Sequence, residues 1–150
     1  MLSYYYDACA LEEGREYYRE FLDRQNPHIC VVGFLSLGEA YGNAHRKGAS
    51  ALEAFTKLMG SIGDKIRVVG HQDIKSILED TLQEFPALEL TDAIHLATAI
   101  REKCSILRTA DRDLFGLHSG RVATLAKRHG CSQFAITRVS LAPKRRRRRS

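Results

Sequence analysis

Apolar residues along the chain fall into short strand-like runs separated by longer stretches with helical spacing. The strand-like runs are LSYYYDAC at residues 2–9, HICVVGF at 28–34, KIRVVG at 65–70, SILRTA at 105–110 and FAITRVSL at 134–141. They are short and rich in aromatic or β-branched residues, which is typical of buried strands. We therefore expect five strands, the first ending near Asp7.

Between these runs, apolar residues recur at the spacing of an amphipathic helix. Leu37, Ala40, Tyr41 and Ala44, for example, stand at i, i+3, i+4 and i+7. The pattern predicts helices at residues 11–24, 36–46, 51–60, 73–85, 90–103 and 122–129, several of them ended by glycine or proline. Strands that alternate with helices indicate an α/β fold with a mainly parallel sheet.

Length and composition favour one soluble domain. The chain has 150 residues, of which 44% are hydrophobic and 27% charged, ordinary values for a globular protein. No apolar run approaches the roughly 20 residues that span a bilayer, and the first residues lack the pattern of a secretory signal. We expect a cytoplasmic protein that does not associate with membranes.

The four cysteines, Cys9, Cys30, Cys104 and Cys131, are far apart and form no C-x-x-C pair. This spacing favours neither a zinc ribbon nor a thioredoxin-type redox motif. We expect reduced cysteines that are mostly buried.

The positive charge is concentrated at the end of the chain. Six of the 23 basic residues lie between Lys144 and Arg149, so 17 remain against 18 acidic residues and the rest of the chain has a net charge of −1. We expect a domain over residues 1–142 and a disordered polybasic tail over residues 143–150. The tail is either a phosphate-binding tether, through residues such as Arg145 and Arg146, or a solubilising extension.

Acidic residues stand where predicted strands end or predicted helices begin. They are Asp7, Glu39, Asp92, Asp111 and Asp113. In a parallel sheet the carboxyl ends of the strands and the first turns of the following helices share one edge, so these carboxylates are expected to converge. Several carboxylates stay ionised together only with a compensating cation, and an all-oxygen ligand set favours Mg²⁺ or Mn²⁺ over Zn²⁺. Such a site suits phosphodiester hydrolysis.

Four segments resemble, in order and separation, the acidic motifs of the PIN-domain nucleases. They are YDACAL at residues 6–11, SLGE at 36–39, TDAIHLATA at 91–99 and LRTADRDL at 107–114. The resemblance implies a three-layer α/β/α sandwich and metal-dependent cleavage of RNA. The small single-domain format is most similar to VapC-type toxins of VapBC toxin–antitoxin pairs, which implies a cognate antitoxin and a homodimer as partners.

The resemblance also implies roles for individual residues. Asp7, Glu39, Asp92 and Asp111 match the catalytic, metal-binding acids and Asp113 matches a frequent fifth acid. Thr109 matches a hydroxyl residue that orients the fourth acid or a metal-bound water. Cys9 departs from the pattern, because many members carry serine or asparagine there. Arg108, Arg112 and Arg121 lie near the acidic edge and are candidates for holding RNA phosphates.

Simpler roles remain open for single residues. Asp92 alone could be a helix cap, and His95, one turn later, is either a ligand or a packed helix residue. The tyrosines of SYYY could stack on bases, but alternation along a strand favours core packing. The alternative function is a catalytically weak PIN-like protein that binds RNA, or one that acts in RNA processing or on the ribosome.

Overall fold

A computed structural model of the chain describes residues 2–13 and 27–139. Five strands form one sheet in the order β3-β2-β1-β4-β5. Their bounds are β1 Ser3–Tyr6, β2 Ile29–Gly33, β3 Ile66–Val69, β4 Ile106–Thr109 and β5 Ala135–Arg138. Every pairing within this sheet is parallel. The expected α/β fold is confirmed, and the sheet is parallel throughout.

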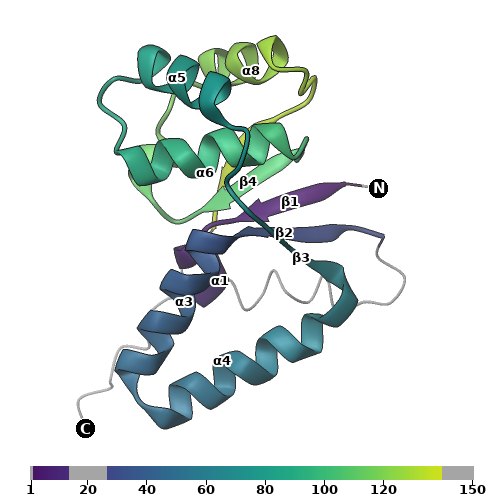
Figure 1. Cartoon of the computed structure of the whole chain (residues 1–150), viewed down its shortest axis with the longest axis vertical. Helices are drawn as coiled ribbons and strands as arrows, with labels where there is room; N and C mark the ends of the chain where they lie inside the picture. Colours follow the sequence, from purple (N-terminus) through teal and green to yellow (C-terminus); the bar gives the residue numbers. More distant parts are fainter. Residues whose placement is uncertain (1, 14–26, 140–150) are drawn as a thin grey trace, which may run out of the picture.

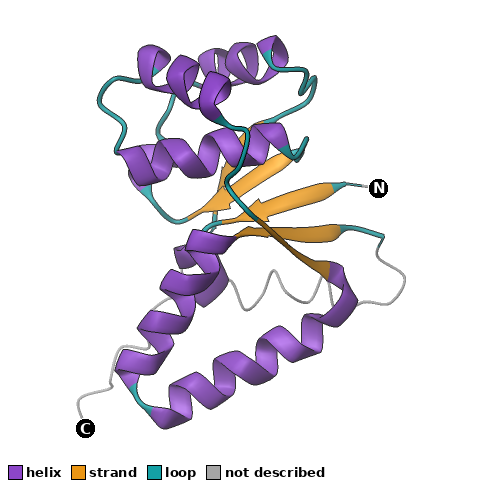
Figure 2. Cartoon of the chain, in the orientation of Figure 1, coloured by secondary structure: helices purple, strands orange, loops and turns teal. Residues whose placement is uncertain are grey.

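Helices cover both faces of the sheet, as Figure 1 shows. On one face lie α1 (Ala8–Glu13), α3 (Phe34–Lys47) and α4 (Ala49–Ile62), and on the other lie α5 (Lys75–Glu84), α6 (Leu90–Arg101) and α8 (Ser119–Arg128). The short segments η1 (Gly63–Lys65) and α7 (Arg112–Phe115) precede β3 and follow β4. The sheet therefore forms the middle layer of a three-layer sandwich, seen by element type in Figure 2.

Two hydrophobic cores follow from the alternation of side chains along the strands. Tyr5 and Leu107 face α6, whereas Tyr6 and Val32 face the α1, α3 and α4 layer. Tyr5 and Tyr6 are both 0% exposed and Tyr4 is almost as buried. The tyrosines are core residues, as alternation predicts, and have no exposed ring face for a base.

The sequence pattern missed some local details. The helix expected from Asp73 begins two residues later, because Asp73 has φ +57, a left-handed conformation that no helix accommodates. The four-residue helix α7 is shorter than a periodic pattern can detect. The predicted helix at 11–24 lies outside the described residues after Glu13, as does the polybasic tail.

The cysteines match the expectation from their spacing. All four are free, and three of them are buried while Cys9 is partly exposed. Among the helices that the structure describes, none is long and apolar enough to cross a membrane.

Candidate functional site

The sheet order places two of the acids at a topological switch point. The chain builds β2 and β3 on one side of β1, then crosses over to build β4 and β5 on the other side. In open parallel sheets, ligands bind beyond the carboxyl ends of the strands where the order reverses. Asp7 directly follows β1 and Asp111 follows β4 by one residue, and these two strands are neighbours.

Three carboxylates gather closely at this edge. Asp92 lies in the first turn of α6, Asp111 caps α7, and Asp113 lies in the first turn of α7. One ligand oxygen from each falls within 4.8 Å of the others. The sequence predicted this convergence, which depends on loops that bring two helix starts together.

None of the ion pairs between described residues involves Asp7, Glu39, Asp92, Asp111 or Asp113. Negative charge at this edge is therefore not compensated by the described part of the protein. The donors are carboxylate oxygens, the ligand type that Mg²⁺ and Mn²⁺ prefer, so the residues present fit a divalent cation.

Asp7 is held by three hydrogen-bond donors although it is only 5% exposed. The backbone N–H of Ala10 and the thiol of Cys9 both donate to Oδ1 at 3.0 Å. The hydroxyl of Thr109 donates to Oδ2, and Thr109 Oγ1 accepts the N–H of Asp111 at 3.0 Å. Thr109 thus connects the carboxylate after β1 to the backbone after β4.

Cys9 lies two residues after Asp7, between that carboxylate and the backbone that follows β4. Its sulfur donates to Asp7 and accepts the N–H of Ala110 at 3.4 Å. The thiol therefore takes the role of a short polar side chain. Burial and the neighbouring carboxylate of Asp7 raise the pKa of Cys9 to about 12, so the sulfur remains a thiol.

Electrostatics at the cleft disfavour charge in the absence of a cation. Burial raises the pKa of Asp7, against the lowering effect of its three donors, and Asp111 raises it further. Burial and then Asp111 raise the pKa of Asp92 from 3.8 to about 6. The pKa of Glu39 is raised by burial and by Asp7, and its side chain lines the same cleft as Asp7.

A cleft of about 220 Å³ is lined by Asp7, Asp92 and Asp111, and also by Glu39 of α3 and by His95. Three more residues line it that the sequence did not single out, namely Glu12, Asn43 and Thr91. Asn43 stands four residues after Glu39, a helical spacing that could have identified it. Glu12 contributes a buried Oε1 that has no hydrogen-bond partner among the described residues.

His95 lines the cleft, but most of its side chain is buried in the protein. It is 3% exposed and hydrogen-bonded to the hydroxyl of Tyr5. Burial lowers the pKa of His95 to about 4, so the ring is neutral at physiological pH.

The arginines near the edge differ in their availability. Arg112 is exposed at the start of α7 beside Asp111. Arg108 is partly buried, with its guanidinium over the ring of Tyr4, and Arg121 is bound to the carboxylate of Glu84. Of these three, Arg112 is the most accessible to a substrate.

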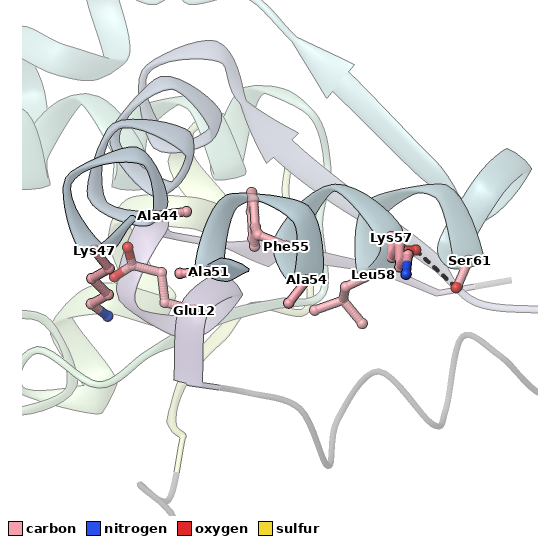
Figure 3. Close-up of a pocket in the computed structure, with 9 residues that line it drawn as sticks. All are labelled: Glu12, Ala44, Lys47, Ala51, Ala54, Phe55, Lys57, Leu58 and Ser61. Atoms are coloured by element: carbon pink, nitrogen blue, oxygen red, sulfur yellow. Dashed lines mark hydrogen bonds between the residues drawn. The ribbon is translucent and has the colours of Figure 1, made fainter. Parts of the chain in front are cut away.

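A larger hollow, of about 500 Å³, lies between α3 and α4 and shares the lining residue Glu12 with the cleft (Figure 3). Its walls include the apolar side chains of Phe55 and Leu58, and its single carboxylate is Glu12. The hydroxyl of Ser61 donates to the backbone carbonyl of Lys57 at 2.9 Å. The carboxylate-rich cleft, and not this hollow, is the candidate site.

Comparison with known proteins shows the fold and the family of the chain. The crystal structure of PAE2754 from Pyrobaculum aerophilum is similar with a TM-score of 0.58 and 20% sequence identity, covering 85% of this chain and 95% of that chain. At that identity the similarity supports the fold alone. No curated protein matches the chain significantly. Residues 2–117 match the profile of the PIN domain, a stretch that contains every acid of the cleft. The chain therefore belongs to the PIN domain family, whose members are typically metal-dependent nucleases.

Proposed function

We propose that this protein is a Mg²⁺- or Mn²⁺-dependent endoribonuclease that hydrolyses phosphodiester bonds in single-stranded or structured RNA. The observation that carries the proposal is the gathering of Asp92, Asp111 and Asp113 within 4.8 Å, without an ion-pair partner among the described residues. A cation bound there would attract the polyanionic substrate that the carboxylates alone would repel. When bound, it would supply positive charge for the phosphate and activate water.

The residues of the cleft would divide the remaining work. Asp92, Asp111 and Asp113 would hold the cation together with Asp7 and Glu39. Thr109 and Cys9 orient the carboxylate of Asp7, each through one hydrogen bond. Because those donors fix both oxygens of Asp7, its lone pairs toward the cleft have a defined direction.

Arginines would hold the substrate strand outside the cleft. Arg112 is exposed beside the acids, and Arg108 lies on β4, which leads into the site. Arg145 and Arg146 belong to the polybasic tail, and Val139, the last described residue before it, donates its N–H to the carbonyl of Thr109 at 2.8 Å. The chain thus leaves the sheet at the acidic edge, which supports a role of the tail in phosphate binding.

Cleavage of a mixed RNA pool tests the proposal. Purified protein is incubated with Mg²⁺ or Mn²⁺, with and without chelator, and the new RNA ends are sequenced. Asp7→Asn removes charge with little change in volume and should abolish cleavage while the protein stays folded. Asp64→Asn, which neutralises an exposed carboxylate in η1, is the matched control and should cleave as wild type. Equal cleavage by Asp7→Asn, or cleavage unaffected by chelator, contradicts the proposal.

We further propose that the nuclease is the toxin of a type II toxin–antitoxin pair. Its support is the motif resemblance and the small single-domain format. The proposal includes a cognate antitoxin and a homodimer as the assembled form. Induced expression should arrest growth, and co-expression of a small protein encoded immediately upstream should relieve the arrest. Light scattering of the purified protein measures the oligomer.

The arginine-rich tail favours a second candidate, a catalytically weak PIN-like protein that binds RNA or acts in RNA processing or on the ribosome. Six basic residues beside a domain of net charge −1 would supply most of the affinity for RNA. Deleting residues 144–150 separates the two functions. Tight RNA binding that disappears on deletion, without metal-dependent cleavage by the full chain, favours the binding protein. Cleavage that persists after deletion favours the nuclease.

A further inference from the structure

Three buried polar side chains from three elements are joined by hydrogen bonds beneath the acidic cleft. Tyr5 Oη of β1 and His95 Nδ1 of α6 are 2.8 Å apart. Ser36 Oγ of α3 lies 3.3 Å from Nδ1 and 3.4 Å from Nε2 of the same ring. Tyr5 and Ser36 are 0% exposed. Because buried polar groups are costly without partners, this Tyr5–His95–Ser36 network fixes β1, α3 and α6 relative to one another.

Each member of the network lies on the same element as one acid, or immediately next to that element. The pairs are Tyr5 and Asp7, Ser36 and Glu39, and His95 and Asp92. The first pair is two residues apart along an extended chain, and the other two pairs are three residues apart on helices. Both spacings place the paired side chains on one side of the backbone. The network therefore connects the elements that carry Asp7, Glu39 and Asp92, whereas Asp111 and Asp113 lie at the start of α7.

A second histidine ties α3 to α6 beside this network. The N–H of Leu35 donates to His71 Nε2 at 3.3 Å, so the ring proton is on Nδ1, which donates to Thr98 Oγ1 at 2.8 Å. Gly33 packs against both Tyr5 and His71. A Cβ at this position would overlap the hydroxyl of Tyr5 and lie 2.7 Å from Cε1 of His71. There is thus no space for a side chain at Gly33, where β2 packs directly against Tyr5 and His71.

We propose that Tyr5, Ser36 and His95 are positioning residues that set the affinity of the acidic cleft for its divalent cation. The inference rests on the proposed metal-dependent activity. Like-charged carboxylates without a basic partner repel one another and tend to separate. A hydrogen-bonded layer that holds their elements together reduces the rearrangement needed when a cation binds.

Tyr5→Phe tests the role of the network, because it removes one hydroxyl and keeps the ring. Tyr6→Phe is the matched control: it removes the same atom from the adjacent residue, which is equally buried but packs on the opposite face of the sheet. Mn²⁺ binding to the RNA-free protein is measured by titration calorimetry. We expect Tyr5→Phe to weaken Mn²⁺ binding about tenfold and Tyr6→Phe to leave it unchanged. Thermal unfolding of the metal-free variants checks that both remain folded.

Two further measurements separate positioning from simple loss of stability. Because the acids are intact, excess Mn²⁺ should restore RNA cleavage by Tyr5→Phe, whereas it should not restore cleavage by Asp7→Asn. Ser36→Ala should weaken Mn²⁺ binding as well. The loss of Mn²⁺ binding free energy in the double variant should be smaller than the sum of the losses in the two single variants, because the effects of residues that act as a unit are not additive.

Equal Mn²⁺ affinity of folded Tyr5→Phe and Tyr6→Phe would overturn the positioning role, and so would absence of Mn²⁺ binding by the wild type. If Tyr5→Phe does not fold, Ser36→Ala against Tyr6→Phe gives the same comparison. Wild-type protein that binds Mn²⁺ but does not cleave RNA would refute the nuclease function, while the binding comparison would still decide the positioning role.

Discussion

Asp92→Asn should stabilise the metal-free protein while it weakens metal binding. The carboxylate of Asp92 lies beside Asp111 and Asp113 without a basic partner among the described residues. Burial is the main cause that raises its pKa from 3.8 to about 6, and the neighbouring acids add to it. Ionised Asp92 is therefore unfavourable in the folded state, and neutral asparagine removes that penalty.

The size of the effect follows from the pKa. The difference between 3.8 and about 6 corresponds to about 3 kcal/mol. Because Asp92 is partly exposed, solvent screening reduces this to roughly 1–2 kcal/mol. Asparagine also loses the attraction between the carboxylate and the positive end of α6, about 0.5 kcal/mol. The net gain for Asp92→Asn at neutral pH is then about 1 kcal/mol.

The sign depends on pH in a defined way. A carboxyl group whose pKa is raised on folding binds more protons in the folded state, so its contribution to stability is full below 3.8 and is lost as pH rises through about 6. The stability difference between variant and wild type should therefore be about 1 kcal/mol above about pH 7 and vanish near pH 4.

Urea unfolding followed by circular dichroism, with chelator and across this pH range, measures the difference. Asp64→Asn serves as the control, because its carboxylate is exposed and outside the cleft. Added Mn²⁺ should stabilise the wild type more than Asp92→Asn, because only the wild type keeps all three carboxylates. A metal-free Asp92→Asn protein that is less stable than wild type at neutral pH would refute the reasoning.

Three further substitutions probe the support of the site. In urea unfolding, Thr109→Val should lower the free energy of unfolding by about 2–3 kcal/mol, because it removes a buried hydrogen bond to the Asp7 carboxylate. The control Thr81→Val loses only a hydrogen bond to a helix carbonyl and should cost about 1 kcal/mol. Equal losses for the two variants would contradict this reasoning. Cys9→Ser should cleave RNA within about threefold of the wild-type rate, whereas Cys9→Ala should cleave about tenfold more slowly, because only serine can replace the hydrogen bond to Asp7. Equal rates for the two variants would contradict a role for this hydrogen bond. Gly33→Ala should lower stability by about 1–3 kcal/mol in the same urea assay through overlap with the packed hydroxyl and imidazole; unchanged stability would show that the site can expand.

Much of the fold was readable from local patterns, because strands and amphipathic helices each leave a periodic signature. The strand at SILRTA and the helix that begins at Leu90 were predicted close to their observed bounds. The misses have local physical causes. Asp73 delays α5 through its left-handed backbone, and α7 is only four residues long.

The cleft was only partly predictable. Asp7, Glu39, Asp92 and Asp111 could be expected at one edge of a parallel sheet, and the structure brings them to one cleft. Glu12 was not expected, because an acid within a helix carries no signal of which way it points.

The sequence by itself determined the class of fold and the charge at its edge, because residue spacing decides which side chains share a face and where each carboxylate falls along an element. Only the tertiary structure decided how Asp7 is bound and what lies beneath the acids. Thr109 meets Asp7 across 102 positions of the chain, and Tyr5 meets His95 across 90. Such bonds depend on the register of β1 with β4 and the packing of α6 on the sheet, which no local pattern specifies.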